Sequence, residues 1–242
     1  MKHKAFRKIL IAVLAVFTIV IAASGIYIAD YYHADDAAIS AFAPDKGVTC
    51  AKIGDNAVVW SPENPVAGFA FYPGGKVEAG AYVPLMESCA ERGILTVLFS
   101  MPGNLAVFDV DAVKSIAGEF GDIDRWFIGG HSLGGSMAAS FVSEYAEYFD
   151  GLILLASYST ADLSNSPLKV LSIYGSEDGV LNGEKYDECR ANLPADFREI
   201  VLDGANHAGF GMYGVQDGDG EAGISNAQQI VITAEAIAEF IK

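Results

Sequence analysis

From residue 48 to its end, the chain alternates short apolar, β-branched runs with amphipathic stretches of helical length. The apolar runs predict strands at 58–60, 66–72, 94–99, 126–129, 152–155, 170–174 and 199–202, and the other stretches predict helices at 81–92, 109–120, 134–148, 183–192 and 226–241. Strands that alternate with helices form right-handed crossovers, which give a mostly parallel sheet with helices on both faces. The sequence therefore predicts an α/β fold for residues 48–242, with the site beyond the carboxyl ends of the strands.

The first 29 residues differ in character from the rest. Four Lys and Arg residues lie among the first eight, and an uncharged apolar run follows at 9–29, long enough to cross the roughly 30 Å hydrocarbon layer as a helix. An uncleaved anchor fits the length of the run better than a signal peptide, for which Ala22-Ala23-Ser24 would be the cleavage site. Both alternatives place the remaining chain outside the cell. Residues 30–47 predict a stalk or a short helix that leads into the domain.

The charge balance argues against nucleic acid as a partner. The chain carries 15 Lys and Arg against 31 Asp and Glu, a formal net charge of −16, whereas phosphate binding requires clustered cations. Hydrophobic residues make up 52% of the chain, which is enough for one well-buried core. Cys50, Cys89 and Cys189 contain no CxxC pair and permit at most one disulfide. We interpret them as small buried hydrophobic side chains.

A G-x-S-x-G sequence stands between a predicted strand and a predicted helix. Gly130-His131-Ser132-Leu133-Gly134 follows RWFIG and opens the run GSMAASFVSEYAEYF. A sharp strand-to-helix turn would expose the hydroxyl of Ser132, and the flanking glycines leave room for neighbouring backbone. The N–H of Leu133 is then placed to donate to an oxyanion. Ser132 is the candidate nucleophile, and a helix cap in a Gly-rich turn is the alternative.

A serine nucleophile needs a general base, and the chain has four histidines. His3 and His33 precede the predicted domain, and His131 is expected to pack under the turn, away from the Ser132 hydroxyl. This leaves His207, which follows the last predicted strand in the Gly-rich loop LDGANHAGFGMYG. We therefore predict that His207 is the base.

A carboxylate on another loop would hold the imidazole of the base in its working tautomer. Asp178 follows the predicted strand at 170–174 in the sequence GSEDGV, and Glu177 beside it is the alternative. The shorter side chain at the apex of the turn favours Asp178.

In the order nucleophile, acid, base, the motifs GHSLGG, GSEDGV and GANHAGF resemble those of the α/β-hydrolase superfamily, in its small uncapped branch of dienelactone hydrolase-like and carboxylesterase-like proteins. The resemblance covers roughly residues 58–242 and implies hydrolysis of a small-molecule ester or related acyl substrate through an acyl-serine, without a cofactor. It also implies a second oxyanion donor in the loop FYPGGK, at Gly74 or Gly75, with Lys76 as a further alternative. Dienelactone hydrolases proper use Cys where this chain has Ser, so their substrate is not carried over.

Two observations concern the substrate. Only about 14 residues separate the predicted strands at 152–155 and 170–174, too few for a helical lid, so we expect an open and accessible site. Candidate substrate contacts are aromatic or thioether side chains near strand ends, for which core packing is the alternative: Tyr72, Met101, Phe108, Tyr158, Phe210 and Tyr213.

The stretch GVQDGDGEAG at 214–223 presents Asp217, Asp219 and Glu221 at alternate positions. It lacks the twelve-residue calcium-loop pattern and its flanking helices, so we interpret it as a solvated turn and expect no metal site. The sequence thus predicts a serine carboxylesterase-like enzyme, anchored in the membrane or secreted. An acyltransferase with the same acyl-serine and a non-catalytic surface binding protein on this fold are the alternatives.

Overall fold

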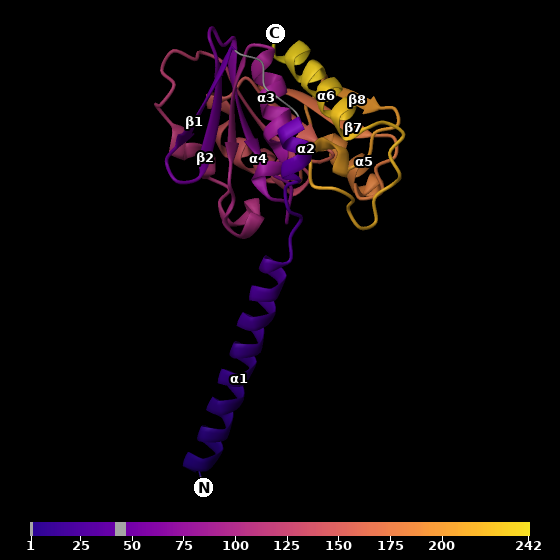
Figure 1. Cartoon of the computed structure of the whole chain (residues 1–242). Helices are drawn as coiled ribbons and strands as arrows, with labels where there is room; N and C mark the ends of the chain where they lie inside the picture. Colours follow the sequence, from indigo (N-terminus) through magenta and orange to yellow (C-terminus); the bar gives the residue numbers. More distant parts are fainter. Residues whose placement is uncertain (1, 42–46) are drawn as a thin grey trace. The chain divides into compact units, whose positions relative to one another are not determined.

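The computed structural model of the chain describes residues 2–41 and 47–242. The chain divides into two units, one that ends at Tyr31 and one that comprises Tyr32–Lys242 (Figure 1). Residues 42–46 of the predicted stalk lie outside the described part of the chain.

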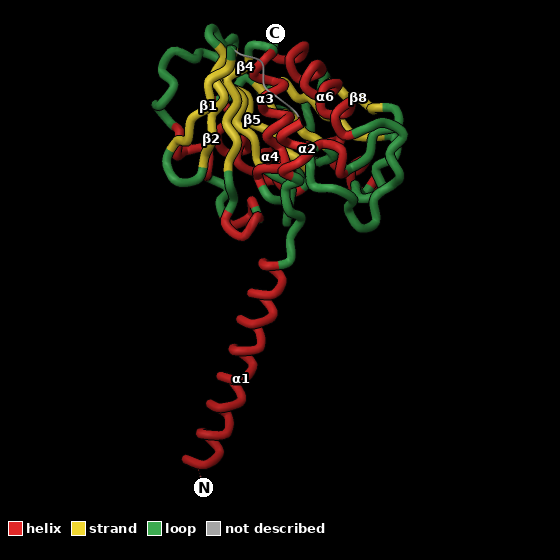
Figure 2. Tube along the Cα trace, viewed as in Figure 1, coloured by secondary structure: helices red, strands yellow, loops and turns green. Residues whose placement is uncertain are grey.

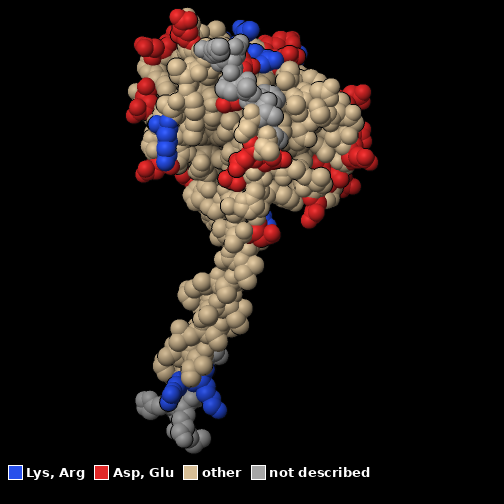
Figure 3. Space-filling model, viewed as in Figure 1, with Lys and Arg blue, Asp and Glu red and all other residues tan. Residues whose placement is uncertain are grey.

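The first unit consists of the helix α1, Lys2–Ala29, and the two residues that follow it. Its segment Phe6–Ala29 is long and apolar enough to cross a membrane. Basic side chains gather at the start of the helix, as Figure 3 shows in blue. Such a helix fits a membrane anchor and a signal peptide alike, so both alternatives stay open.

The domain is built on a mostly parallel sheet, as predicted. Its strands are yellow in Figure 2. Its strands follow the spatial order β1-β2-β4-β3-β5-β6-β7-β8. Among the strand pairs in the described part of the chain, only β1–β2 and β2–β4 are antiparallel. The strands are β1 (Val48–Ile53), β2 (Ala57–Pro62), β3 (Ala67–Tyr72), β4 (Ile94–Phe99), β5 (Trp126–His131), β6 (Gly151–Leu155), β7 (Lys169–Gly175) and β8 (Arg198–Leu202).

The strand β1 was not predicted. It forms a hairpin with β2, in which Val48 lies opposite Pro62 and Ile53 lies opposite Ala57. Its four central residues are exposed, since β1 is an edge strand with one neighbour. An exposed edge strand needs no apolar run, and its sequence VTCAKI therefore gave no signal of burial. Cys50 on this strand is exposed, which corrects the prediction of a buried thiol.

Helices cover both faces of the sheet, as predicted. Helices α3 and α6 pack against each other on one face, and α4 packs on β5 and β6. In β3 the side chains of Phe69 and Phe71 join the core under α3 and α6, whereas Ala70 and Tyr72 join the core under α4. The helices of the domain are α2 (Asp36–Ala41), α3 (Val83–Glu91), α4 (Leu133–Tyr145), α5 (Gly183–Cys189) and α6 (Asn226–Ile241).

The α-helix predicted at 109–120 is wrong. Only a 3₁₀ turn, Ala112–Ile116, forms there. The buried hydroxyl of Tyr72 donates to the carbonyl oxygen of Val110 (2.8 Å) and accepts from the N–H of Val113 (3.0 Å). Both backbone groups would serve the hydrogen bonds of an α-helix, so their bonds to Tyr72 favour a tighter and shorter turn.

The segment predicted as a stalk at 30–47 is hydrogen-bonded to the domain from Tyr32 onward. The backbone of Tyr32 makes two hydrogen bonds, of 2.7 and 2.9 Å, with residues 76–78. The N–H of Asp35 donates to the carbonyl oxygen of Met212 at 2.8 Å. Because these bonds fix the backbone, the compact domain begins at Tyr32 and not at the predicted residue 48.

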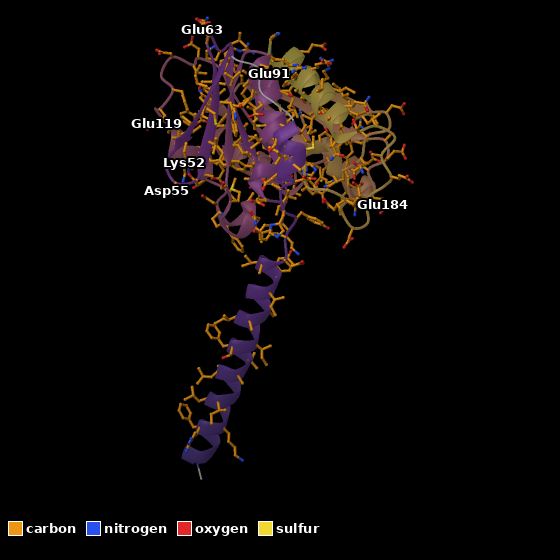
Figure 4. The ribbon with its side chains drawn as sticks, viewed as in Figure 1. Lys52, Asp55, Glu63, Glu91, Glu119 and Glu184 are labelled. Carbon is orange, nitrogen blue, oxygen red and sulfur yellow. The ribbon has the colours of Figure 1, made fainter. Side chains whose placement is uncertain are left out.

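The acidic charge of the chain lies on the surface of the domain (Figure 3). Exposed charged side chains project from its periphery in Figure 4, among them Lys52, Asp55, Glu63, Glu91, Glu119 and Glu184. Most of the net negative charge therefore lies on side chains at the surface.

Tyr72→Phe tests the role of the Tyr72 hydroxyl in the fold. The substitution leaves the half-buried carbonyl of Val110 and the buried N–H of Val113 without their partner, which costs about 1–3 kcal/mol in the free energy of unfolding. Urea unfolding of the full chain in detergent, followed by tryptophan fluorescence, measures the loss. Tyr148→Phe is the matched control, because Tyr148 is 67% exposed and its change should stay within about 0.5 kcal/mol. Equal losses in both variants would contradict this account.

Candidate active site

Ser132 lies in a strained turn between β5 and α4. Its backbone has φ 51° and ψ −121°, a conformation that L-residues rarely adopt. A Cβ atom on Gly130 or on Gly134 would lie 2.4 or 2.2 Å from the carbonyl oxygen of Tyr72. Glycine is therefore required on both sides of the turn, as its sequence pattern predicts, because the backbone of β3 approaches so closely.

Backbone strain gathers at this edge of the sheet. Among the described residues, the non-glycine positions with positive φ are Lys76, Asn104, Ser132 and Ala156. They follow the carboxyl ends of β3, β4, β5 and β6. Such strain persists only where surrounding contacts enforce it, and it clusters at functional sites. The strained residues therefore mark the edge where the sequence places the site.

A side chain that the sequence analysis missed holds the Ser132 turn. The Ser157 hydroxyl, just after β6, donates to the carbonyl oxygen of Ser132 at 2.7 Å. The N–H of Ser132 donates to Leu155 at 2.9 Å, which extends the β5–β6 ladder into the turn. The position of Ser157 directly after a buried strand was the available signal.

His207 and Asp178 form a buried pair. The Nδ1 atom of His207 lies 2.9 Å from Oδ2 and 3.1 Å from Oδ1 of Asp178, and the two side chains are 1% and 2% exposed. The Oδ1 atom of Asp178 also accepts from the N–H groups of Val180 and Leu181. These bonds orient the carboxylate toward Nδ1. Glu177, the alternative, is exposed and accepts from Ser176.

The other ring nitrogen of His207 is available for chemistry. Its Nε2 atom is buried and has no hydrogen-bond partner within the described residues. Ser132 Oγ is not hydrogen-bonded to it there, although the His131 ring, next to Ser132 in the chain, lies 4.5 Å from the His207 ring, centroid to centroid. Catalytic hydrogen bonds are often long before substrate binds. The arrangement leaves Nε2 free to accept a proton.

His131 packs beneath the turn, as expected. Its side chain is 1% exposed, and its Nδ1 atom lies 2.8 Å from the hydroxyl of Tyr82. Burial lowers the pKa of His131 well below its usual value, and the neighbouring His207 lowers it further. A neutral imidazole therefore supports the floor of the site.

The loop after β3 contains two N–H groups that are already engaged. Gly74 donates to the buried hydroxyl of Tyr82 at 3.1 Å, and Lys76 donates to the carbonyl oxygen of Asn104 at 2.7 Å. Neither N–H is free for an oxyanion. This corrects the candidate role of Gly74. Nothing in the sequence indicated that a tyrosine eight residues later would take this N–H.

Gly75 remains as the donor from this loop. Neither its N–H nor that of Leu133 has a hydrogen-bond partner among residues 47–242. A Cβ atom on Gly75 would lie 2.9 Å from Cδ2 of Leu133, so the two residues are in contact. Backbone N–H groups without partners, one of them at the start of a helix, can stabilise negative charge.

Asp219 ties two loops of the site together. Its Oδ1 atom accepts from the N–H groups of Gly179 and His207, both at 3.1 Å, and Oδ2 accepts from Ala208 at 2.8 Å. The stretch 214–223 is thus more than a solvated turn. Its alternating acidic residues could not show that one carboxylate would accept backbone N–H groups of distant loops.

The six candidate substrate contacts fall into different environments. Tyr72 and Phe210 are fully buried, Met101 and Tyr213 are 6% exposed, Tyr158 is half-buried and Phe108 is 60% exposed. Full burial gives Tyr72 and Phe210 a packing role, which corrects their candidate role. The hydroxyl of Tyr72 is also satisfied by backbone partners. Phe108 and Tyr158 offer the largest accessible surfaces of this set.

No group of three His, Cys, Asp or Glu side chains arranged to hold a metal occurs in the described part of the chain. All three cysteines are free. Cys89 is buried, as predicted, and its burial raises the pKa of the thiol to about 12. Cys189 is half-buried. These thiols lie outside the Ser132 turn and the His207 loop.

Comparisons with known proteins agree with this architecture. A sequence model of the alpha/beta hydrolase family matches residues 68–231, more than half of the chain. Among solved structures, a predicted CIB-like hydrolase from Thermoplasma acidophilum is similar, with a TM-score of 0.59 and 15% identity over 79% of this chain and 98% of that chain. TT1662 from Thermus thermophilus has a TM-score of 0.58 and 15% identity over 81% and 98%. At this identity the similarity shows the fold alone. The sequence matches none of the curated proteins with which it was compared.

The lowered pKa of His131 predicts how stability depends on pH. Because the unfolded chain binds a proton to this histidine more readily than the folded chain does, the free energy of unfolding falls as the pH drops below about 6.5. One such group contributes at most about 1.4 kcal/mol per pH unit. His131→Asn keeps a hydrogen-bond acceptor near Tyr82 but does not titrate. Urea unfolding between pH 7 and 5 should therefore show a shallower decline in the variant, and parallel declines would refute the assignment.

Proposed function

Because the chain belongs to the alpha/beta hydrolase family, we propose that it is a serine hydrolase that cleaves a carboxylic ester or related acyl bond through an acyl-serine at Ser132. The observation that carries this proposal is the His207–Asp178 pair, buried and hydrogen-bonded at Nδ1 while Nε2 stays unpartnered. It lies at the same edge of the sheet as the strained Ser132 turn. A serine, an imidazole and a carboxylate in these roles activate a hydroxyl for acyl transfer.

Each step of the proposed reaction uses a group already described. As Ser132 Oγ bonds to the carbonyl carbon, its proton passes to Nε2 of His207. Asp178 stabilises the imidazolium that forms. The carbonyl oxygen becomes an oxyanion, which the N–H groups of Gly75 and Leu133 hold. His207 then protonates the leaving alcohol as the C–O bond breaks.

Release of the acyl group repeats these steps with water. His207 takes a proton from a water molecule as its oxygen bonds to the acyl carbon. Collapse of the second oxyanion breaks the bond to Ser132 Oγ, which regains its proton from His207. The products are a carboxylic acid and an alcohol.

The connection between β6 and β7 leaves the proposed site open to substrate. Residues 156–168 contain no helix, and this part of the chain is described in full. No cap covers the site from this position, so short soluble esters should reach Ser132.

Hydrolysis of a p-nitrophenyl ester series, from acetate to long acyl chains, tests the proposed function. The full chain in detergent should cleave the short esters. Ser132→Ala should reduce the rate to background, and His207→Ala should lower kcat by about 10²- to 10⁴-fold. Ser143→Ala and His33→Ala, at exposed positions, should leave the rate unchanged.

Three outcomes would contradict the hydrolase assignment. Turnover that persists in Ser132→Ala would exclude the acyl-serine. A folded chain that cleaves no ester but becomes acylated at Ser132 would favour transfer to an acceptor other than water. A chain that is neither acylated nor active would be a binding protein on this fold.

We also infer that α1 remains as a single-pass anchor with the domain outside the cell. The apolar segment Phe6–Ala29 and its basic start support this inference. The expressed protein should stay with membranes after carbonate extraction and dissolve only in detergent. A soluble product whose first residue lies near Gly25 would instead identify a cleaved signal peptide.

A further inference from the structure

We propose that the site acts on amphiphilic acyl esters held in the membrane that α1 enters. The inference rests on the proposed hydrolase function and deepens it by naming a substrate class. Its basis is the path of the chain, which leaves α1 and within a few residues is hydrogen-bonded to two loops of the site.

The chain has little length between α1 and the domain. Helix α1 ends at Ala29, and only Asp30 and Tyr31 precede Tyr32, the first residue of the compact domain. Three extended residues reach about 11 Å at most. The covalent link therefore keeps Tyr32 within about 11 Å of the last residue of α1, whatever orientation the domain takes.

Tyr32 is bound to the loop that carries the proposed oxyanion donor. Its N–H donates to the carbonyl oxygen of Lys76 at 2.7 Å, and its carbonyl oxygen accepts from Glu78 at 2.9 Å. Gly75, the proposed donor, directly precedes Lys76. The tether thus ends at the site loop itself and not at a remote face of the domain.

Tyr32 also contacts the segment that follows His207. Its hydroxyl accepts from the N–H of Asp217 at 3.2 Å, and its ring centroid lies 5.7 Å from that of Tyr213. Tyr32 therefore contacts both the loop that contains Gly75 and the segment that follows His207. A membrane-inserted α1 would hold them close to the bilayer surface.

Exposed apolar side chains lie on loops of the same sheet edge. Val107 and Phe108 follow β4 and are 51% and 60% exposed, and Val215 in the segment after His207 is 90% exposed. Leu105, just before the first pair, is within reach of a Cβ atom on Gly75. Exposed apolar side chains on such loops can insert into the interfacial layer of a membrane.

These features select the class of ester. An amphiphile in a bilayer exposes its ester group near the interface, where an open site without a cap can reach it. A short tether gives esters in the same bilayer a high effective concentration at the site. This effective concentration falls as the tether lengthens. Esters dissolved in water gain nothing from the tether.

A spacer inserted between Tyr31 and Tyr32 tests the proposal. The full chain, with its intact mass verified, is reconstituted into phosphatidylcholine vesicles that contain 4-methylumbelliferyl oleate, and p-nitrophenyl acetate serves as the soluble substrate. Twelve Gly and Ser residues would extend the reach of the link by roughly 20 Å. The same spacer between Gly121 and Asp122, in an exposed loop, is the matched control.

We expect the Tyr31–Tyr32 spacer to lower kcat/KM for the vesicle ester by about fivefold or more and to leave hydrolysis of the soluble ester unchanged. The control insertion should leave the hydrolysis of both esters unchanged. Val107→Asp combined with Val215→Asp should likewise reduce only the vesicle reaction, with Ile232→Asp on α6 as its control. Equal loss of both substrates in the Tyr31–Tyr32 variant would overturn the proposal, because the spacer would then act through folding of the site.

The membrane substrate and the hydrolase function can be disproved separately. Ser132-dependent hydrolysis of the soluble ester, with vesicle hydrolysis absent or insensitive to the spacer, overturns the membrane substrate alone. Absence of Ser132-dependent hydrolysis of both esters overturns the proposed function and this inference with it.

Discussion

The close approach of α4 to the end of β3 is the constraint on which the site depends. The carbonyl oxygen of Tyr72 occupies the space in which a Cβ atom on Gly130 or Gly134 would lie. This contact forces the chain to turn sharply and holds Ser132 at positive φ. The side chain of Leu133, the first residue of α4, lies against Gly75. The turn that carries the proposed nucleophile thus depends on one backbone contact.

Side chains from distant parts of the sequence stabilise the loops around this turn. Tyr82 accepts the N–H of Gly74 and contacts His131 beneath the turn. Asp219 accepts N–H groups from the Asp178 and His207 loops. The bonds of Tyr82 and the bond from His207 to Asp219 satisfy buried or half-buried polar groups that would otherwise destabilise the fold. The groups in the proposed reaction are therefore held by residues that do not take part in it.

The local sequence predicted those parts of the structure that local chemistry determines. The apolar runs predicted seven strands, most of which are buried and therefore need uninterrupted hydrophobic residues. The Gly-rich turn indicated Ser132, and post-strand loops indicated His207 and Asp178, because their neighbours in the chain define these positions. Ser225 and Gln228 form a capping box that starts α6 at the predicted residue.

Features that depend on contacts between distant residues were missed. The failed helix at 109–120 depends on a hydroxyl from Tyr72, and the engagement of Gly74 depends on Tyr82. The role of Asp219 likewise appears only when the folded chain brings three loops together. Hydrophobic periodicity carries no information about such hydrogen bonds, since it reports only which side chains are buried.

Reaction with a fluorophosphonate most directly tests the central claim that Ser132 is an activated nucleophile. The full chain in detergent would be treated with the reagent, digested and analysed by mass spectrometry. The account predicts a single adduct on Ser132 and its loss when Asp178→Ala removes the partner of His207. An unmodified Ser132 in a folded chain, or labelling that is spread over other exposed serines, would contradict it.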